Sequence, residues 1–83
     1  MPSQETVEIA RRGQYIYDQQ WRARLEATHP GQFVAIEPES GGVYLAESLS
    51  EAIQAARAAH PDRLVFALRV GHQTTVDLGV VIP

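Results

Sequence analysis

The sequence contains no cysteine, so a disulfide framework and a thiolate metal site are both excluded. Lysine is also missing, and all seven basic residues are arginine. The longest apolar run, residues 64–68, is far too short to cross a bilayer, so we expect no membrane span. The polar first residues predict no signal peptide, and the lack of cysteine is typical of the cytoplasm, where we expect the protein to act.

The 83 residues predict one small domain with a thin core. Ten acidic and seven basic residues give a formal net charge of −3. This balance argues against a nucleic-acid binder, which usually presents a concentrated positive field. Many domains of this size gain stability by associating, because their own stability margin is narrow.

Hydrophobic periodicity predicts helices and strands in the order α-β-β-α-β-β. The first helix covers residues 3–28, and Gly13 inside it is expected either to kink it or to separate residues 1–12 as a loose helical extension. The second runs from a capping box formed by Ser48 and Glu51 to about Ala59. Strand patterns cover residues 32–37, 43–46, 64–70 and 74–78, and an apolar tail follows at 80–83. The chain therefore reads as a single α+β domain, residues 1–83, with two helices packed on a small, mainly antiparallel sheet of three to four strands.

A His-Pro pair ends each predicted helix, at His29 and at His60. This repeat indicates either an ancient duplication of a helix-strand-strand unit or the shared chemistry by which proline stops a helix. The histidines do not fall in an HxH or HExxH spacing, so the sequence predicts no metal site and no cofactor.

Acidic residues are dense around the first predicted hairpin, and a solvated acidic face is the leading interpretation. The alternatives are a pair of carboxylates that performs acid–base chemistry, which would require burial, and a surface for an arginine-bearing partner. This group consists of Glu37, Glu39, Glu47 and Glu51. Ser40 precedes two glycines, but the sequence nominates no histidine held by an acid beside it, and we predict no catalytic residue.

Two apolar surfaces are candidates for a partner interface. One is the first helix, through Tyr15, Tyr17 and Trp21, and the other is the C-terminal strand, through Val76, Leu78 and Val80. Together they exceed what a thin core can cover, so the leading prediction is a non-enzymatic interaction module. It would form a homo-oligomer, with a dimer favoured, or bind a protein partner by apolar burial and strand addition.

Two other functions remain open on the sequence alone. A nucleic-acid-binding regulator would use the arginines that alternate with aromatic residues on the first helix, Arg11, Arg12, Arg22 and Arg24. A small enzyme would need a concave site, which a chain this short can build only between subunits.

Three segments resemble a family of short uncharacterised bacterial proteins. Residues 10–18 match its "RRG..IY[DE]" motif, residues 31–37 match "G[KQ].VAI[DE]", and Pro61-Asp62 with residues 68–72 match "PD…RVGH". Genes of this family often lie beside a gene for a small aspartic-protease-like protein, which implies a two-gene pair; no catalytic residues are established for it. Here Gln32 replaces the usual lysine, and residues 73–78 replace a basic tail.

Overall fold

The computed structural model describes residues 4–71 and 80–82. The elements are α1 (Gln4–Ile16), the π-helix η1 (Tyr17–Trp21), α2 (Arg22–Thr28), β1 (Phe33–Glu37), β2 (Gly42–Ala46), α3 (Leu49–Ala59), β3 (Val65–Arg69) and β4 (Val80–Ile82). With α1, η1 and α2 counted as one helical segment, the element order agrees with the prediction through β3, and the α+β class is confirmed.

The strands form one sheet in the order β2-β1-β3-β4, and each neighbouring pair is antiparallel. β3 lies between β1 and β4, as fits a strand whose residues are apolar on both faces. The segment 80–82 was predicted to be an apolar tail. It is instead the strand β4, since Val80 pairs with Ala67 and Ile82 pairs with Val65. The strand predicted at 74–78 lies outside the described residues.

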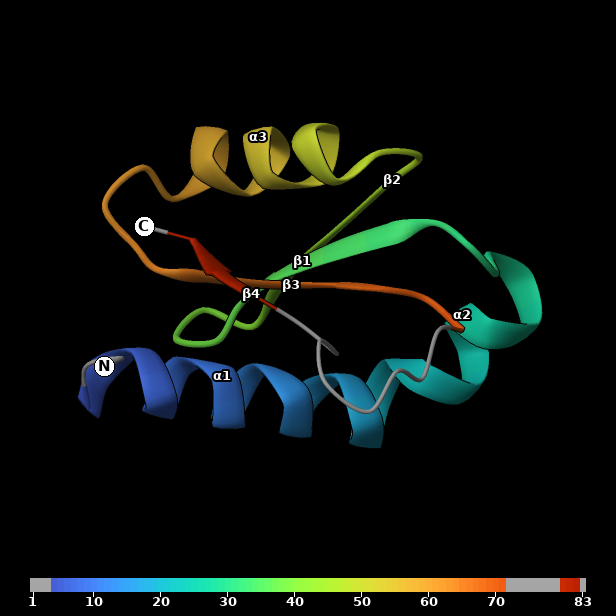
Figure 1. The fold of residues 1–83 in the computed structure, drawn as a ribbon, viewed down its shortest axis with the longest axis horizontal. Coiled ribbons are helices and arrows are strands. Elements are labelled where there is room, and N and C mark those ends of the chain that lie inside the picture. Colours follow the sequence, from blue (N-terminus) through green and yellow to red (C-terminus); the bar gives the residue numbers. More distant parts are fainter. Residues whose placement is uncertain (1–3, 72–79, 83) are drawn as a thin grey trace.

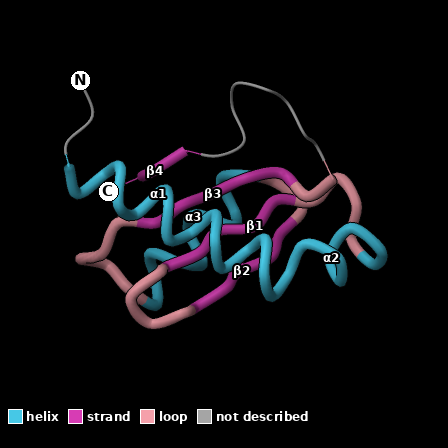
Figure 2. Tube along the Cα trace, turned by 90° about the horizontal axis from the view of Figure 1, so that it is seen from below, coloured by secondary structure: helices cyan, strands magenta, loops and turns pink. Residues whose placement is uncertain are grey.

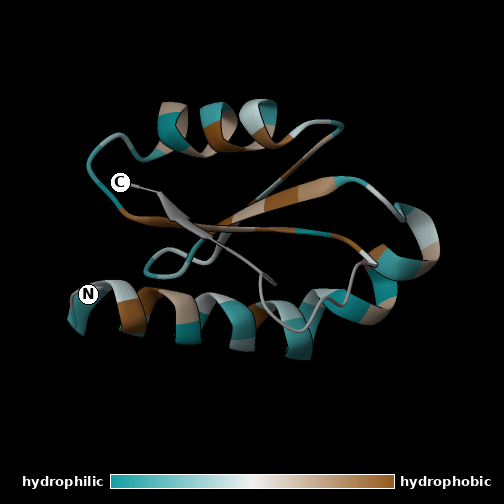
Figure 3. Ribbon diagram, in the orientation of Figure 1, coloured by the Kyte–Doolittle hydropathy of each residue, from teal (hydrophilic) through white to brown (hydrophobic). Residues whose placement is uncertain are grey.

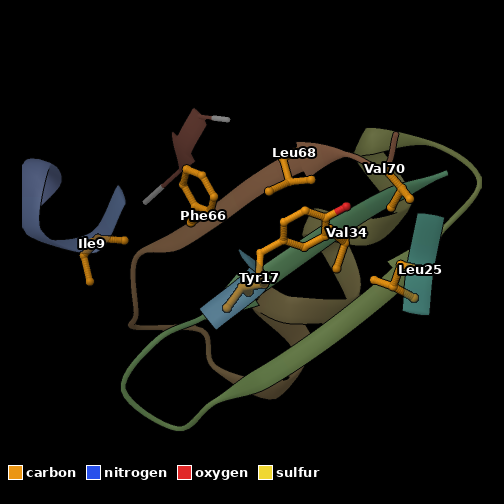
Figure 4. Packing of buried hydrophobic residues seen from close by; sticks show 8 residues of the cluster. Ile9, Tyr17, Leu25, Val34, Phe66, Leu68 and Val70 are labelled. Carbon is orange, nitrogen blue, oxygen red and sulfur yellow. The ribbon is translucent and has the colours of Figure 1, made fainter. Parts of the chain in front are cut away.

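The helices cover opposite faces of the sheet and give three layers (Figure 1, Figure 2). The segment α1–η1–α2 packs on one face against large side chains, among them Val34, Phe66 and Leu68 (Figure 4). Helix α3 packs on the other face through Ala52 and Ala56, against a surface that is also rich in alanine. Apolar residues are concentrated in β1 and β3, the middle layer (Figure 3).

The first helix is not kinked at Gly13. α1 runs through this glycine, and Ile9 lies in the core, so residues 4–12 belong to the packed helix. Gly13 instead permits close approach, because a Cβ atom built there would lie 2.6 Å from the Cβ of Phe66. The irregularity comes later, where the π-helix η1 changes the periodicity between Tyr17 and Trp21.

The predicted capping box at Ser48 is present, since the Ser48 hydroxyl accepts a hydrogen bond of 3.1 Å from the Glu51 N–H. At the other ends of the helices, His29 and His60 are equivalent C-caps. Their backbone N–H groups donate to the carbonyls of Leu25 and Ala56, respectively. The proline that follows each histidine prevents the helix from continuing.

The His-Pro repeat does not mark two halves related by rotation. β1 and β3 are antiparallel neighbours, and β2 and β4 flank them symmetrically. A rotation that exchanges β1 with β3 and β2 with β4 would keep both helical layers on one face, whereas the helices lie on opposite faces. The two half-units therefore have opposite handedness, which favours shared helix-stopping chemistry over duplication as the source of the repeat.

Candidate partner-binding surface

A shallow, mainly apolar hollow lies between the second half of α1 and the turn that joins β1 to β2. It has a volume of about 380 Å³ and is lined by Arg11, Arg12, Tyr15, Ile16 and Pro38. Tyr15 is 65% exposed, which makes it the most exposed large apolar side chain in the described part of the chain. An aromatic ring beside two guanidinium groups is a combination enriched at protein–protein contacts.

The other apolar residues predicted for an interface are placed differently. Tyr17 is 3% exposed and belongs to the core, where its ring lies close to Leu68 and Val34 (Figure 4). Burial, reinforced by the Glu26 carboxylate, raises the pKa of the Tyr17 phenol, so it stays neutral at physiological pH. Tyr17 therefore contributes to stability, and the surface available on α1 is centred on Tyr15.

Trp21 is half-buried, packs against the same core cluster and carries the Arg24 guanidinium above its ring. At the C-terminal strand, Val80 opens β4, which is an edge of the sheet. Val76 and Leu78 lie outside the described residues. Of the predicted interface residues that the structure describes, Tyr15 is exposed and Val80 lies in an edge strand. Tyr17 lies in the core, and Trp21 packs against it.

The four arginines of the nucleic-acid hypothesis do not form one uncompensated field. Arg11 pairs with Glu8 at 3.7 Å, and Arg22 pairs with both Asp18 and Glu26. Arg24 lies over Trp21. Within the described residues, neither Arg12 nor Arg24 has an acidic side chain within ion-pair distance, and of these two only Arg12 lines the hollow beside Tyr15.

The turn that supplies Pro38 to the hollow is fixed by a buried carboxylate. Glu37 is 0% exposed, which corrects the interpretation of this residue as part of a solvated acidic face. Its oxygens accept hydrogen bonds from the backbone N–H groups of Glu39 at 3.0 Å and Ser40 at 2.9 Å. Burial acts to raise the pKa of Glu37, but these hydrogen bonds and one from the Ser40 hydroxyl outweigh it and hold the pKa below its ordinary value.

His60 ties the same turn to the end of α3. Its Nε2 lies 3.2 Å from the Ser40 hydroxyl, its Nδ1 lies 3.9 Å from Glu37 Oε1, and its ring makes an edge contact with Tyr44. Next to it, Arg63 forms an ion pair with Glu39. The turn is thus attached to α3 on one side of the sheet, while Pro38 contacts the hollow on the other side.

Ser40, His60 and Glu37 follow the order of contacts found in a serine hydrolase triad, but the geometry favours a structural role. The 3.9 Å separation of His60 and Glu37 is too long for a hydrogen bond. The N–H groups of residues 39 and 40 bind the Glu37 carboxylate, that of Gly41 binds the Glu37 carbonyl, and that of Gly42 binds the Ser40 hydroxyl. None of these N–H groups remains free to stabilise an oxyanion.

Sequence reasoning missed this group because it joins residues 20 positions apart. The available signal was the alternation of side chains along β1. Glu37 lies on the same face of the strand as Phe33 and Ala35, and this face packs against α3. A carboxylate at the buried end of a strand, directly before a proline-containing turn, fits an acceptor for the turn's N–H groups.

No protein-family model, curated protein or solved structure matches this chain. Among the described residues, no cluster of three or more histidine, aspartate or glutamate side chains is arranged to hold a metal ion. No helix in residues 4–71 or 80–82 combines the length and apolar character that a membrane span requires.

Proposed function

We propose that this chain is a non-enzymatic interaction module that binds a partner protein in the hollow between α1 and the β1–β2 turn. The exposed Tyr15 ring in an apolar hollow carries the proposal, because a large aromatic left in water on a small domain gains most from being covered. Ile16 extends this apolar surface, and Pro38, which is itself buried, lines the hollow on backbone that the Glu37 carboxylate fixes.

The charge around the hollow indicates the chemistry of the partner. Arg12 lies at the hollow without an acidic neighbour among the described residues, and Arg11 is only loosely paired with Glu8. A segment with an apolar side chain for the hollow and carboxylates beside it would satisfy both properties. The family resemblance makes the product of an adjacent gene the first partner to test.

Photocrosslinking in living cells tests the proposal directly. A photoreactive phenylalanine derivative at position 15 should capture a protein, whereas the same group at Ala58, an exposed site on the opposite helical layer, should not. Tyr15→Ala should then weaken binding of the captured, purified partner by at least about tenfold, since buried aromatic anchors are typical hot spots. Thermal unfolding of the Tyr15→Ala chain should remain near that of the wild type.

The same experiment separates the alternatives. Capture of RNA or DNA at position 15, weakened by Arg12→Glu and by salt, would support the nucleic-acid-binding regulator instead. Equal protein capture at positions 15 and 58 would contradict a specific site at the hollow.

A further inference from the structure

The β2 edge of the sheet is open and carries none of the usual protection. Within the described residues, β2 pairs only with β1, so its outer backbone N–H and C=O groups have no strand partner. Natural sheet edges are normally blunted by a charge, a proline or a bulge. β2 has the sequence GVYLA, without a charge or a proline, and all five of its residues are half-buried.

The alternation of β2 makes this edge complementary to itself. Val43 and Leu45 pack with the core on the α1 face, whereas Tyr44 and Ala46 pack on the α3 face. When two copies pair their β2 strands antiparallel, the two-fold axis is perpendicular to the sheet, and the α1 layers of both copies lie on the same side. Residues that face each other across the two β2 strands must therefore come from the same face of the sheet. Centring the pair on Tyr44 places Val43 opposite Leu45 of the second copy and uses the full strand.

Charge also permits this register. The nearest acidic residues, Glu39 and Glu47, lie outside β2 on either side, and the Tyr44-centred register places Glu47 opposite Gly41 of the second copy. Like charges therefore do not face each other across the seam, the line along which the two β2 strands pair. The side chain of Tyr44 is also held away from the seam, since its ring lies against Gly42 of its own strand and contacts His60.

We infer that the chain forms a homodimer through antiparallel pairing of β2 with β2 of a second copy. The result is one continuous sheet across both protomers, with the helices of each protomer covering its own half of that sheet. A second copy is the occupant that this edge fits best, because the symmetric register matches apolar side chains on both faces and closes without leaving a further β2 edge. The inference does not depend on the hollow beside Tyr15.

A charge-exchange experiment tests both the dimer and its register. The wild-type chain should sediment as a dimer in analytical ultracentrifugation. Val43→Lys and Leu45→Glu, each alone, should raise the dimer dissociation constant at least about tenfold, because an unpaired charge then faces an apolar side chain at the seam. Circular dichroism and Trp21 fluorescence establish that each variant is folded.

Mixing the two variants should restore association as a heterodimer. In the Tyr44-centred register, Lys at position 43 of one chain faces Glu at position 45 of the other, and the remaining pair is the native Leu45 with Val43. A shifted register would not bring these charges together. A wild-type chain that is monomeric at high concentration, or a dimer that both single variants leave intact, would overturn the inference.

These outcomes are distinct from those of the crosslinking experiment. Loss of capture at position 15 with an intact dimer would reject the proposed function alone. A monomeric wild type that still captures a partner at position 15 would reject the β2 seam alone.

Discussion

The two faces of the sheet are covered by helices in different ways. On the α1 face the core is built from large side chains, including Tyr17, Leu25 and Phe66. On the α3 face it is built largely from alanine, with Ala52 and Ala56 at 0% exposure. Small side chains on both surfaces let a helix lie close to the sheet, whereas large side chains must interdigitate.

Both helical layers keep a mainly apolar hollow, one beside Leu49 and Ile53 on α3 and the other beside Tyr15 on α1. The exposed Tyr15 and the hollow beside it lie at the margin of the layer packed through large side chains. The alanine-rich layer is instead fastened by polar contacts, because Glu37 and His60 connect the β1–β2 turn to the end of α3. Four substitutions test whether the two layers are stabilised by these different means.

The largest effect is expected from Phe66→Ala. Phe66 is buried at the centre of the α1 face, and its removal leaves a cavity that the neighbouring large side chains cannot close, so we expect a loss of about 3–5 kcal/mol in the free energy of unfolding. Val65→Ala, the adjacent buried residue on the α3 face, should cost about 1–3 kcal/mol. Urea denaturation measures both. Equal losses would mean that the two faces do not differ in how packing stabilises them.

Glu37→Gln should lower stability by about 1–3 kcal/mol at neutral pH, because an amide cannot accept both backbone hydrogen bonds as the carboxylate does. The sign of the pH dependence follows from the lowered pKa of Glu37. The carboxylate contributes fully above the pKa of an unfolded-chain glutamate, about 4.3, and the contribution is lost as pH falls through the lower folded-state pKa.

The wild type and the Glu37→Gln variant should therefore converge in stability as the solution is acidified below that range. Denaturant unfolding at a series of pH values measures the difference, and Glu5→Gln is the control because Glu5 is exposed on α1, away from the turn. A constant gap between wild type and Glu37→Gln across acidic pH would show that the carboxylate charge is not what holds the turn.

Local sequence signals accounted for most of the elements, and the exceptions have physical causes. The capping box at Ser48 and the His-Pro stops act within a few residues, so the helix ends could be predicted. The assignment of β4 depended on pairing with β3, a distant contact that periodicity in a short apolar segment cannot reveal.

The candidate site was predictable only in part. Tyr15 and Tyr17 were both interface candidates, and tertiary packing separates them: Tyr17 continues the buried i, i+4 spacing of Ile9 and Gly13, whereas Tyr15 stays exposed. The burial of Glu37 and its proximity to His60 depend on which face of the sheet α3 covers, and this is a tertiary property.

The smallest effect, but the most informative in sign, is expected from Gly13→Ala. Helix propensity alone predicts a gain of about 1 kcal/mol for this change. The added methyl would lie 2.6 Å from the Cβ and 2.7 Å from the Cγ of Phe66, so α1 must shift away from β3, and overpacking of this kind costs about 1–3 kcal/mol. We therefore expect a net loss of roughly 1 kcal/mol, from the difference between these two terms.

Ala23→Gly, at an exposed position of α2, provides the control for propensity and should cost about 1 kcal/mol. Replacing Phe66 would not relieve the contact at Gly13 as long as its Cβ remains. If Gly13→Ala stabilised the protein in urea unfolding, α1 would have to stand further from β3 at this point than the structure places it. The α1 face would then lack the close approach to β3 at Gly13, and the contrast between the two layers would be larger.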